Sequence, residues 1–388
     1  MIYDVAIVGL GATGAAAAFQ LAKRGARIVG LDRLAPPHDH GSSHGETRIT
    51  RLAIGEGDHL TPLAMRSHEI WSEVEQETGA SLLTTTGGLI VSSEATVAET
   101  HVKGFFRRTL AAAEKFAIPH QLLDAKEIRA RFPQFRVQDD EWGYFEPSAG
   151  YLRPEACIQA QLALAARHGA DLRTGTRMLG FEIGQDSVRL RTADGEFAAE
   201  RLILAAGSWL PQFLDAPLAK LFRIYRQVQL WFEARGAARQ FEAPHFPVFI
   251  WELRDARRGL YGFPAIGGGG SIKVASETFE NTTTPETVQR SVSPHEIAEV
   301  YRDLVAPHLP AIGSRCIRTA TCLYTVTPDF GFVIDRHPDS ARVILASPCS
   351  GHGFKHSAAI GEALATLTLE RESCVDLSPF RLSRFGVC

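Results

Sequence analysis

The sequence predicts an α/β fold of two domains, and three observations support this prediction. A strand, a glycine-rich turn, a helix and a second strand follow one another within residues 3–33. A similar strand, glycine turn and helix occupy 342–369, and the stretches 222–251 and 260–277 alternate apolar and polar residues as antiparallel strands do. The chain has 388 residues, enough for two domains, and its 45% hydrophobic content can form a large core.

The N-terminal unit has the spacing of a dinucleotide-binding motif. It consists of a strand at 5–8, glycines at Gly9, Gly11 and Gly14, a helix at 15–23 and a strand at 27–31 that ends at Asp32. Gly9 permits a tight turn, Gly11 lets the backbone approach a pyrophosphate, and Gly14 lets the helix pack closely on the strand. The helix N-terminus attracts phosphate, and Asp32 can accept hydrogen bonds from an adenosine ribose. The motif predicts a Rossmann-type domain, but it does not choose between NAD and FAD.

Composition and spacing argue against several other classes of protein. A net charge of −3 gives no sign of a nucleic-acid surface. Six cysteines without a CxxC pair argue against a disulfide framework or a zinc site, and favour reduced thiols in a cytoplasmic protein. His38, His40 and His44 lie in an irregular loop without an HxxxH pair, so we expect no metal site. We also expect neither a signal peptide nor a transmembrane helix, and hence no membrane partner.

The elements between the two glycine-rich units are predicted from periodicity and turn residues. Helices are expected over 59–78, 97–117, 126–132, 153–168 and 294–306; strands over 87–92, 143–151, 187–192, 197–204, 315–325 and 332–335. The segment 201–209 is a buried strand that runs into small residues and Gly207, which places bare backbone against a flat ligand.

Four charged or polar residues are candidates for a site. Thr47, Arg48 and Arg51 follow a glycine-rich turn near the predicted pyrophosphate. Arginines there can neutralise phosphate or hold a carboxylate with a bidentate fork, and a solvated basic turn is the alternative. Lys273 alternates with apolar neighbours in a predicted strand, a pattern that by itself favours a solvated lysine.

Longer motifs carry a resemblance to a known family. They are GLGATG at 9–14, GSSHGETRITR at 41–51, LYGFP at 260–264, CLYTVTPDFGFVID at 322–335 and SGHGFKHSAAIGE at 350–362. With these motifs the chain resembles the monomeric sarcosine oxidase and N-methyltryptophan oxidase family, within the D-amino-acid-oxidase-like FAD enzymes. The resemblance spans nearly the whole chain, and the last two blocks are far more specific than GxGxxG.

The resemblance implies a fold, a cofactor and partners. The implied domains are a discontinuous Rossmann-type FAD-binding domain at 1–85, 146–218 and 315–388, and an α+β substrate domain with an antiparallel sheet at 86–145 and 219–314. The cofactor would be FAD, attached covalently through Cys322. The partners would be a small-molecule amino-acid substrate and O2, without nucleic acid, for a monomeric protein.

The resemblance also implies site residues, position by position. They are Lys273, Arg48 and His44 for catalysis; Arg51, Lys355, Tyr261 and Tyr324 for the substrate; and Gly9, Gly11, Gly14, Asp32, Arg33, Ser42, Thr47, Gly207, Cys322, Gly351, Gly353 and Phe354 for the cofactor. Lys273 matches the lysine that activates O2, where a cation stabilises superoxide-like charge. Arg51 and Lys355 match the pair that holds the substrate carboxylate. A Cys322 thiolate can attack the flavin methyl carbon, and a buried apolar thiol is the alternative.

Three departures from the family pattern bear on the substrate. Glu277 stands where the sarcosine oxidases carry a histidine, Ile54 stands where they have a tyrosine, and the loop 255–259 is longer. An acid at 277 would favour a different or more cationic amine. We therefore expect oxidation of the C–N bond of N-methyl or related amino acids with reduction of O2 to H2O2, without assigning sarcosine itself.

Two other functions remain open at this point. One is an amine dehydrogenase of the same fold that uses an acceptor other than O2, and the other is an FAD-binding protein without turnover. An NAD-dependent dehydrogenase is disfavoured by the second glycine-turn helix and by the CLYT block.

Overall fold

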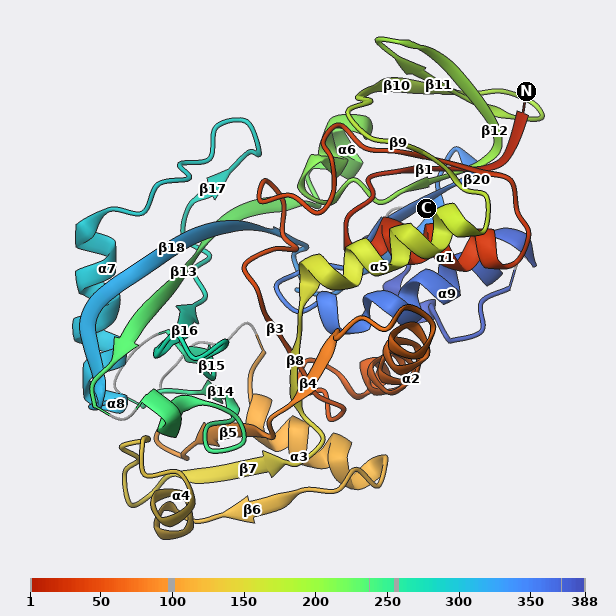
Figure 1. Ribbon diagram of the computed structural model, residues 1–388. Helices are drawn as coiled ribbons and strands as arrows, with labels where there is room; N and C mark the ends of the chain where they lie inside the picture. Colours follow the sequence, from red (N-terminus) through yellow and green to blue (C-terminus); the bar gives the residue numbers. More distant parts are fainter. Residues whose placement is uncertain (1, 97–101, 237, 255–257, 371, 387–388) are drawn as a thin grey trace.

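The computed structural model describes residues 2–96, 102–236, 238–254, 258–370 and 372–386. Across these ranges the strands form three sheets (Figure 1). One is largely parallel, one is largely antiparallel, and a small sheet of β3 (Arg48–Thr50), β8 (Gly150–Leu152) and β4 (Leu83–Thr85) lies between them in this view. The two large sheets confirm the predicted α/β class with a second, antiparallel region.

The parallel sheet is built around the apolar strand β1 (Ile2–Val8). This strand lies between β2 (Ile28–Leu31) and β12 (Gly195–Leu204) and is parallel to both. The sheet is extended by β9 (Asp171–Arg173) and β20 (Ser340–Ser347), and by the antiparallel strands β10 (Met178–Ile183), β11 (Val188–Thr192) and β19 (Val333–His337). The carboxyl ends of β1, β2, β12 and β20 therefore meet at one edge, where ligands bind in open α/β sheets.

Helices cover this sheet because small residues let them pack closely. Helix α1 (Ala12–Lys23) lies beside α5 (Pro154–Arg167) and α9 (Ser357–Leu369), and α2 (Thr61–Thr78) packs on α9 (Figure 1). The alanines at 15–18 of α1 are fully buried, and a Cβ on Gly361 of α9 would clash with Ala16. Small side chains at this contact thus set how near α9 comes to the N-terminal unit.

The second large sheet carries the aromatic core. Its strand order is β17 (Thr282–Thr283), β13 (Arg223–Ala234), β16 (Ser271–Ser276), β15 (Leu260–Phe263), β14 (Val248–Trp251), β5 (Gly88–Ser92), β7 (Trp142–Glu146) and β6 (Gln121–Leu123), with β18 (Ile312–Val326) also paired to β13. The rings of Phe135 and Phe246 stack with centroids 4.9 Å apart, and Phe249 contacts both. Around the sheet lie α3 (Phe105–Lys115), α4 (Ala125–Arg131), α7 (Pro294–Val300) and α8 (Ala306–His308); α6 (Ala216–Ala219) lies near the parallel sheet.

The structure corrects some sequence-based boundaries. Helix α3 begins at Phe105, because Gly104 before it has a left-handed backbone; residues 97–101 of the predicted helix lie outside the described residues. Strand β14 was expected in an antiparallel set; it is antiparallel to β15 but parallel to β5. The short strands β3, β4, β6 and β17 and the strand β10 were not predicted. The predicted domain limit at residue 315 falls inside β18, and the domain division stays a prediction.

Candidate cofactor and active site

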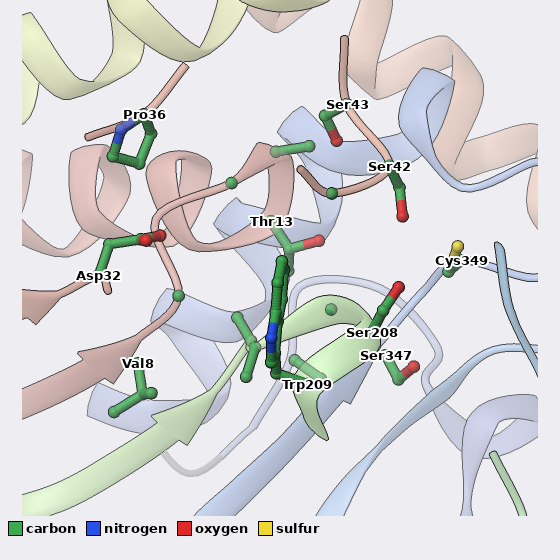
Figure 2. A pocket seen from close by; sticks show the side chains of 18 of the residues that line it. Val8, Thr13, Asp32, Pro36, Ser42, Ser43, Ser208, Trp209, Ser347 and Cys349 are labelled. Atoms are coloured by element: carbon green, nitrogen blue, oxygen red, sulfur yellow. The ribbon is translucent and has the colours of Figure 1, made fainter. Parts of the chain in front are cut away.

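A long cavity opens at the carboxyl edge of the parallel sheet. Among the residues that line it are Gly9, Gly11, Asp32, Arg33, Ser42, Gly207, Gly351, Gly353 and Phe354, all predicted for the cofactor. In Figure 2, Asp32 and Val8 lie on one side of this hollow, and Ser42, Ser347 and Cys349 lie on the other. We refer to it as the cofactor cavity. It brings together chain segments that are more than 300 residues apart in the sequence.

The glycine turn has the shape that a phosphate-bearing ligand needs. A Cβ on Gly9 would clash with the Ala205 carbonyl oxygen, and one on Gly14 would clash with the Gly9 carbonyl oxygen. A Cβ on Gly11, by contrast, would meet nothing within 4 Å. Gly11 is also the N-cap of α1, and no side chain caps this helix end. The first N–H groups of α1 are therefore left for an anion, which fits the pyrophosphate of FAD.

Asp32 is fixed at the end of β2 by backbone hydrogen bonds. Its two carboxylate oxygens accept from the N–H groups of Leu10 and Leu34, each at 2.8 Å. Each oxygen can accept a further hydrogen bond, so the side chain can still receive a ribose hydroxyl. Beside it, Arg33 pairs with Glu286 at 3.3 Å and lies over the Trp209 ring.

A second cavity adjoins the first and has charged residues in apolar walls. Both cavities are lined by Arg48, Tyr324, Gly351 and Phe354, so they meet at these residues. The second cavity, called the substrate cavity below, is also lined by Ile49, Arg51, Glu56, Phe105, Ile250, Trp251, Tyr261, Phe263, Lys273, Glu277 and Lys355. A flat ring held at the junction would be accessible from the substrate cavity.

Two buried cations face one carboxylate at the substrate cavity. Arg51 Nη2 lies 2.5 Å from Glu56 Oε2, and Lys355 Nζ lies 3.1 Å from Glu56 Oε1. All three side chains are almost fully buried, and burial lowers the pKa of Lys355 to about 8 while Glu56 opposes that shift. The predicted pair Arg51 and Lys355 thus converges on one carboxylate group. Glu56 itself was not predicted, because an isolated glutamate in a loop gives no sequence signal.

Lys273 is buried, so the solvated lysine that the strand pattern favoured is wrong. Only 3% of its surface is exposed, because β16 is an interior strand and the turn 45–47 covers the face from which the lysine projects. Its Nζ donates to the carbonyl oxygens of Gly45 and Thr47 at 2.8 and 2.7 Å, and lies 4.0 Å from the Phe263 ring centroid. Burial lowers its pKa well below the ordinary lysine value.

Four other predicted residues lie near the junction of the two cavities and differ in their contacts and protonation. Arg48 donates to the carbonyl oxygens of Ser42 and Thr47 at 2.6 and 2.8 Å. Burial lowers the pKa of His44 to about 4, so this histidine is neutral near pH 7. The hydroxyl oxygens of Tyr261 and Tyr324 lie 3.4 Å apart, and burial raises the pKa of both phenols.

The buried Cys322 lies on β18 and accepts a hydrogen bond from Gln229 Nε2 at 3.2 Å. Within the described part of the chain, Gly14, His44, Thr47 and Cys322 are not among the residues that line the two cavities.

Three buried polar atoms near these residues lack a partner. Across the described residues, no hydrogen bond reaches His44 Nε2, Thr47 Oγ1 or Gln229 Oε1. Buried polar atoms are nearly always satisfied in folded proteins, so such atoms indicate a missing polar ligand or water. The open glycine cradle fits a large polar cofactor, and of the three unsatisfied atoms Gln229 Oε1 belongs to a residue that lines the substrate cavity.

Within the ranges that the structure describes, no group of three or more His, Cys, Asp or Glu side chains is placed to hold a metal ion. The cysteines at 157, 316, 322, 349 and 374 are all free. None of the helices in the described ranges combines the length and apolar character needed to cross a membrane.

Comparisons with known proteins agree with this arrangement. The family described as FAD dependent oxidoreductase matches residues 4–367. A monomeric sarcosine oxidase from Streptomyces avermitilis is 40% identical over 95% of this chain and 94% of its own length. One from Bacillus sp. strain B-0618 is 38% identical over 98% and 96%, and an N-methyl-L-tryptophan oxidase from Yersinia pestis is 31% identical over 99% and 100%.

Solved structures share the fold. NikD, described as an unusual amino acid oxidase essential for nikkomycin biosynthesis, superposes with a TM-score of 0.83 at 23% identity, covering 98% of this chain and 97% of NikD. L-proline dehydrogenase from P. horikoshii has a TM-score of 0.81 at 20% identity, covering 99% and 98%. The chain therefore belongs to the FAD dependent oxidoreductase family, in the group that contains the monomeric sarcosine oxidases and the N-methyl-L-tryptophan oxidases.

Proposed function

We propose that this chain is an FAD-dependent oxidase of N-methyl or related amino acids that reduces O2 to H2O2. The observation that carries the proposal is the meeting of two cavities, one with a dinucleotide cradle and one with a pair of cations and a buried lysine. FAD, when bound, supplies the acceptor of the hydride from the substrate carbon and the donor of electrons to O2.

In this proposal the cofactor is held by the glycine turn, Asp32 and the turn before α9. Cys322 would hold the flavin covalently through its sulfur, to which the Gln229 amide donates a hydrogen bond. Arg48 sits at the junction of the cavities, where its charge stabilises negative charge on the ring system. Neutral His44 and Thr47 supply hydrogen bonds to the same region.

The substrate binds through its carboxylate. That group takes the place of Glu56 between Arg51 and Lys355, since two buried cations already converge there. Phe105, Trp251, Tyr261 and Tyr324 form apolar walls that exclude water from the reacting carbon. The domain division, with the antiparallel sheet roofing the cofactor, and a monomeric state belong to the same proposal.

The charged residues of the substrate cavity affect the protonation of the substrate amine and the choice of substrate. The cations Arg51, Lys355 and Lys273 favour loss of the ammonium proton, so no side chain needs to act as a strong base. The carboxylate of Glu277 in the same cavity favours positive charge on the substrate. It therefore favours substrates that carry an additional positive charge. We therefore assign amines more cationic than sarcosine as the preferred substrates.

Lys273 acts on the oxygen side of the reaction. Its ammonium stabilises the negative charge that develops as O2 accepts electrons, and the low-polarity surroundings strengthen that interaction.

A substrate screen tests the proposal. Purified yellow protein is incubated in air with N-methyl, D-, cyclic, dibasic and glycated amino acids, and peroxide is measured beside reduction of an artificial dye. Peroxide formed in proportion to substrate consumed is the expected result. Dye reduction with almost no peroxide would instead indicate the dehydrogenase, and no reaction in either assay would indicate an FAD-binding protein without turnover.

The covalent bond has its own test. Acid-precipitated wild-type protein is expected to keep its flavin in the pellet, whereas Cys322→Ser releases the flavin to the supernatant, because serine cannot form the thioether. Flavin absorbance of the two fractions is the measurement. Release from the wild type as well would show that the attachment is absent.

A further inference from the structure

We propose that Glu46, held from outside by Arg318, is a positioning residue that fixes Lys273 for its reaction with O2. This inference rests on the proposed function, in which Lys273 stabilises charge on oxygen. Neither Glu46 nor Arg318 lines the cofactor cavity or the substrate cavity within the described part of the chain. Both would therefore act through other groups.

A row of side chains across three strands connects Lys273 with the protein surface. Trp231 on β13 is the register partner of Lys273 on β16 and of Arg318 on β18. Side chains directly opposite one another in antiparallel pairs project from the same face of the sheet. The Arg318 guanidinium lies 4.5 Å and the Lys273 ammonium 5.7 Å from the Trp231 ring centroid. Arg318 is half exposed and Lys273 is buried, so the row runs from solvent to the interior.

The turn 45–47 contacts this row at both ends, at Arg318 and at Lys273. Glu46 accepts a hydrogen bond from Trp231 Nε1 at 3.0 Å and forms an ion pair with Arg318. The carbonyl groups on either side of it, those of Gly45 and Thr47, accept both hydrogen bonds that Lys273 Nζ donates in the structure. The position of Lys273 is therefore coupled through one turn to the outer ion pair.

The backbone of Glu46 makes this turn possible. Its φ of 69° is in the left-handed region, which is uncommon for a residue with a side chain. This conformation places the two neighbouring carbonyls toward one ammonium. Glu155, in the first turn of α5, fixes the same turn by accepting the N–H groups of Gly45 at 2.6 Å and Glu46 at 3.2 Å. Strain of this kind persists where surrounding contacts hold it, and it is common at functional sites.

The charges around Lys273 agree with this role. Burial and the neighbouring Arg48 lower the lysine pKa, whereas Glu155 and Glu46 raise it. The carboxylates of Glu46 and Glu155 therefore help to keep the ammonium protonated. An ion pair as exposed as that of Glu46 and Arg318 contributes little to stability, so its loss is expected to be seen in the reaction with O2 rather than in unfolding.

The test measures reoxidation separately from substrate turnover. Holoenzyme is reduced anaerobically with dithionite and mixed with oxygenated buffer over a range of pH. Glu46→Gln is expected to slow reoxidation about tenfold on the alkaline side, because losing the carboxylate lowers the fraction of protonated lysine. Arg318→Met removes a cation and does not lower the lysine pKa, so it is expected to slow reoxidation about three- to tenfold at every pH, because Glu46 is no longer held in place. The alkaline limb of the rate should move to lower pH in Glu46→Gln alone, and Arg318→Lys should restore most of the rate lost in Arg318→Met.

Two further variants test whether the effect comes from the Glu46 side chain, from the turn conformation or from any exposed ion pair. Glu46→Gly keeps the left-handed turn and loses the carboxylate, so it should resemble Glu46→Gln; a rate near wild type in Glu46→Gly would overturn the role of the side chain. Arg315→Met is the matched control, because Arg315 on β18 forms an exposed ion pair with Glu233 on β13 and does not contact the turn 45–47. Its reoxidation should equal that of the wild type.

The possible failures can be distinguished. Normal reoxidation in Glu46→Gln and Arg318→Met, while Lys273→Met is slow, would overturn only the positioning role. Normal reoxidation in Lys273→Met as well would overturn the oxygen role of Lys273 in the proposed function. Slow reoxidation in Arg315→Met equal to that in Arg318→Met would also contradict the inference, because the effect would then belong to the sheet in general.

Discussion

The cofactor cavity and the substrate cavity are built in different ways. The first is formed mainly by backbone and small residues such as Gly9, Gly11 and Gly207 at strand ends. The second is formed by long charged side chains, including Arg51, Glu56, Lys273 and Lys355, that are buried among aromatic rings. Binding in a cavity formed by backbone requires that no side chain fills the space. Buried charged side chains, by contrast, are stable only when partners of opposite charge or hydrogen-bonding groups surround them. Substitutions should therefore affect occupancy in the first cavity and electrostatics in the second.

The largest effect is expected from Lys273→Met in the substrate cavity. Loss of the ammonium removes stabilisation from the charge that forms on O2, which corresponds to about 10²–10³-fold slower reoxidation. The rate of flavin reduction by substrate, measured anaerobically on the same protein, should change little. Equal slowing of both steps would show that the lysine supports the whole site rather than the oxygen reaction.

A pair of glycine variants tests the cofactor cavity. Gly14→Ala places a methyl group on the Gly9 carbonyl oxygen and is expected to cost about 2–3 kcal/mol of unfolding free energy. Gly11→Ala meets no protein atom within 4 Å, so the apoprotein should keep its stability and lose affinity for FAD. Thermal unfolding and flavin content are the measurements. Unchanged flavin content in Gly11→Ala would contradict the cradle.

Arg51→Ala tests the carboxylate pair. Losing a charged hydrogen-bond donor to the substrate should raise KM about 10- to 100-fold for amino acids, with a smaller change in kcat. An amine of the same shape without a carboxylate serves as the control and should show little change. Steady-state kinetics with both substrates are the measurement. An unchanged KM for the amino acid would show that Arg51 does not bind the substrate carboxylate.

The smallest effect is a pH dependence from Lys355. Its pKa is lowered to about 8 by burial, so the ammonium is present below that pH and is lost as the pH rises through it. KM for a carboxylate substrate should therefore rise about three- to tenfold between pH 7 and 9. Lys355→Met should have a high KM that lacks this rise. The same rise in Lys355→Met would assign it to another group, such as the substrate amine.

The contrast between the cavities also explains what the sequence could predict. Gly9, Gly11, Gly14 and Asp32 lie in one continuous segment, and local spacing alone placed them in the unit formed by β1, α1 and β2. Most helices and most strands followed from periodicity for the same reason, whereas α6 was not predicted. The start of α3 was predicted too early, because residues 102–104 continue the amphipathic pattern although Gly104 has a left-handed backbone and the helix begins after it.

The electrostatic site needed the three-dimensional structure. The alternation around Lys273 predicted a solvent-exposed side chain. No local pattern shows that β16 lies between β13 and β15 or that a turn covers its face. Glu56 between Arg51 and Lys355, and Trp231 between Lys273 and Arg318, arise from the pairing of distant segments. Resemblance to a family indicated which residues to examine, but it did not indicate these partners.

Anaerobic mixing of the purified protein with an N-methyl amino acid, followed by admission of air, tests the central claim most directly. The account predicts that the yellow flavin bleaches with substrate and regains its colour with oxygen, with one peroxide formed for each substrate oxidised. Flavin that stays yellow with every amine, or that bleaches and does not recover in air, would contradict it.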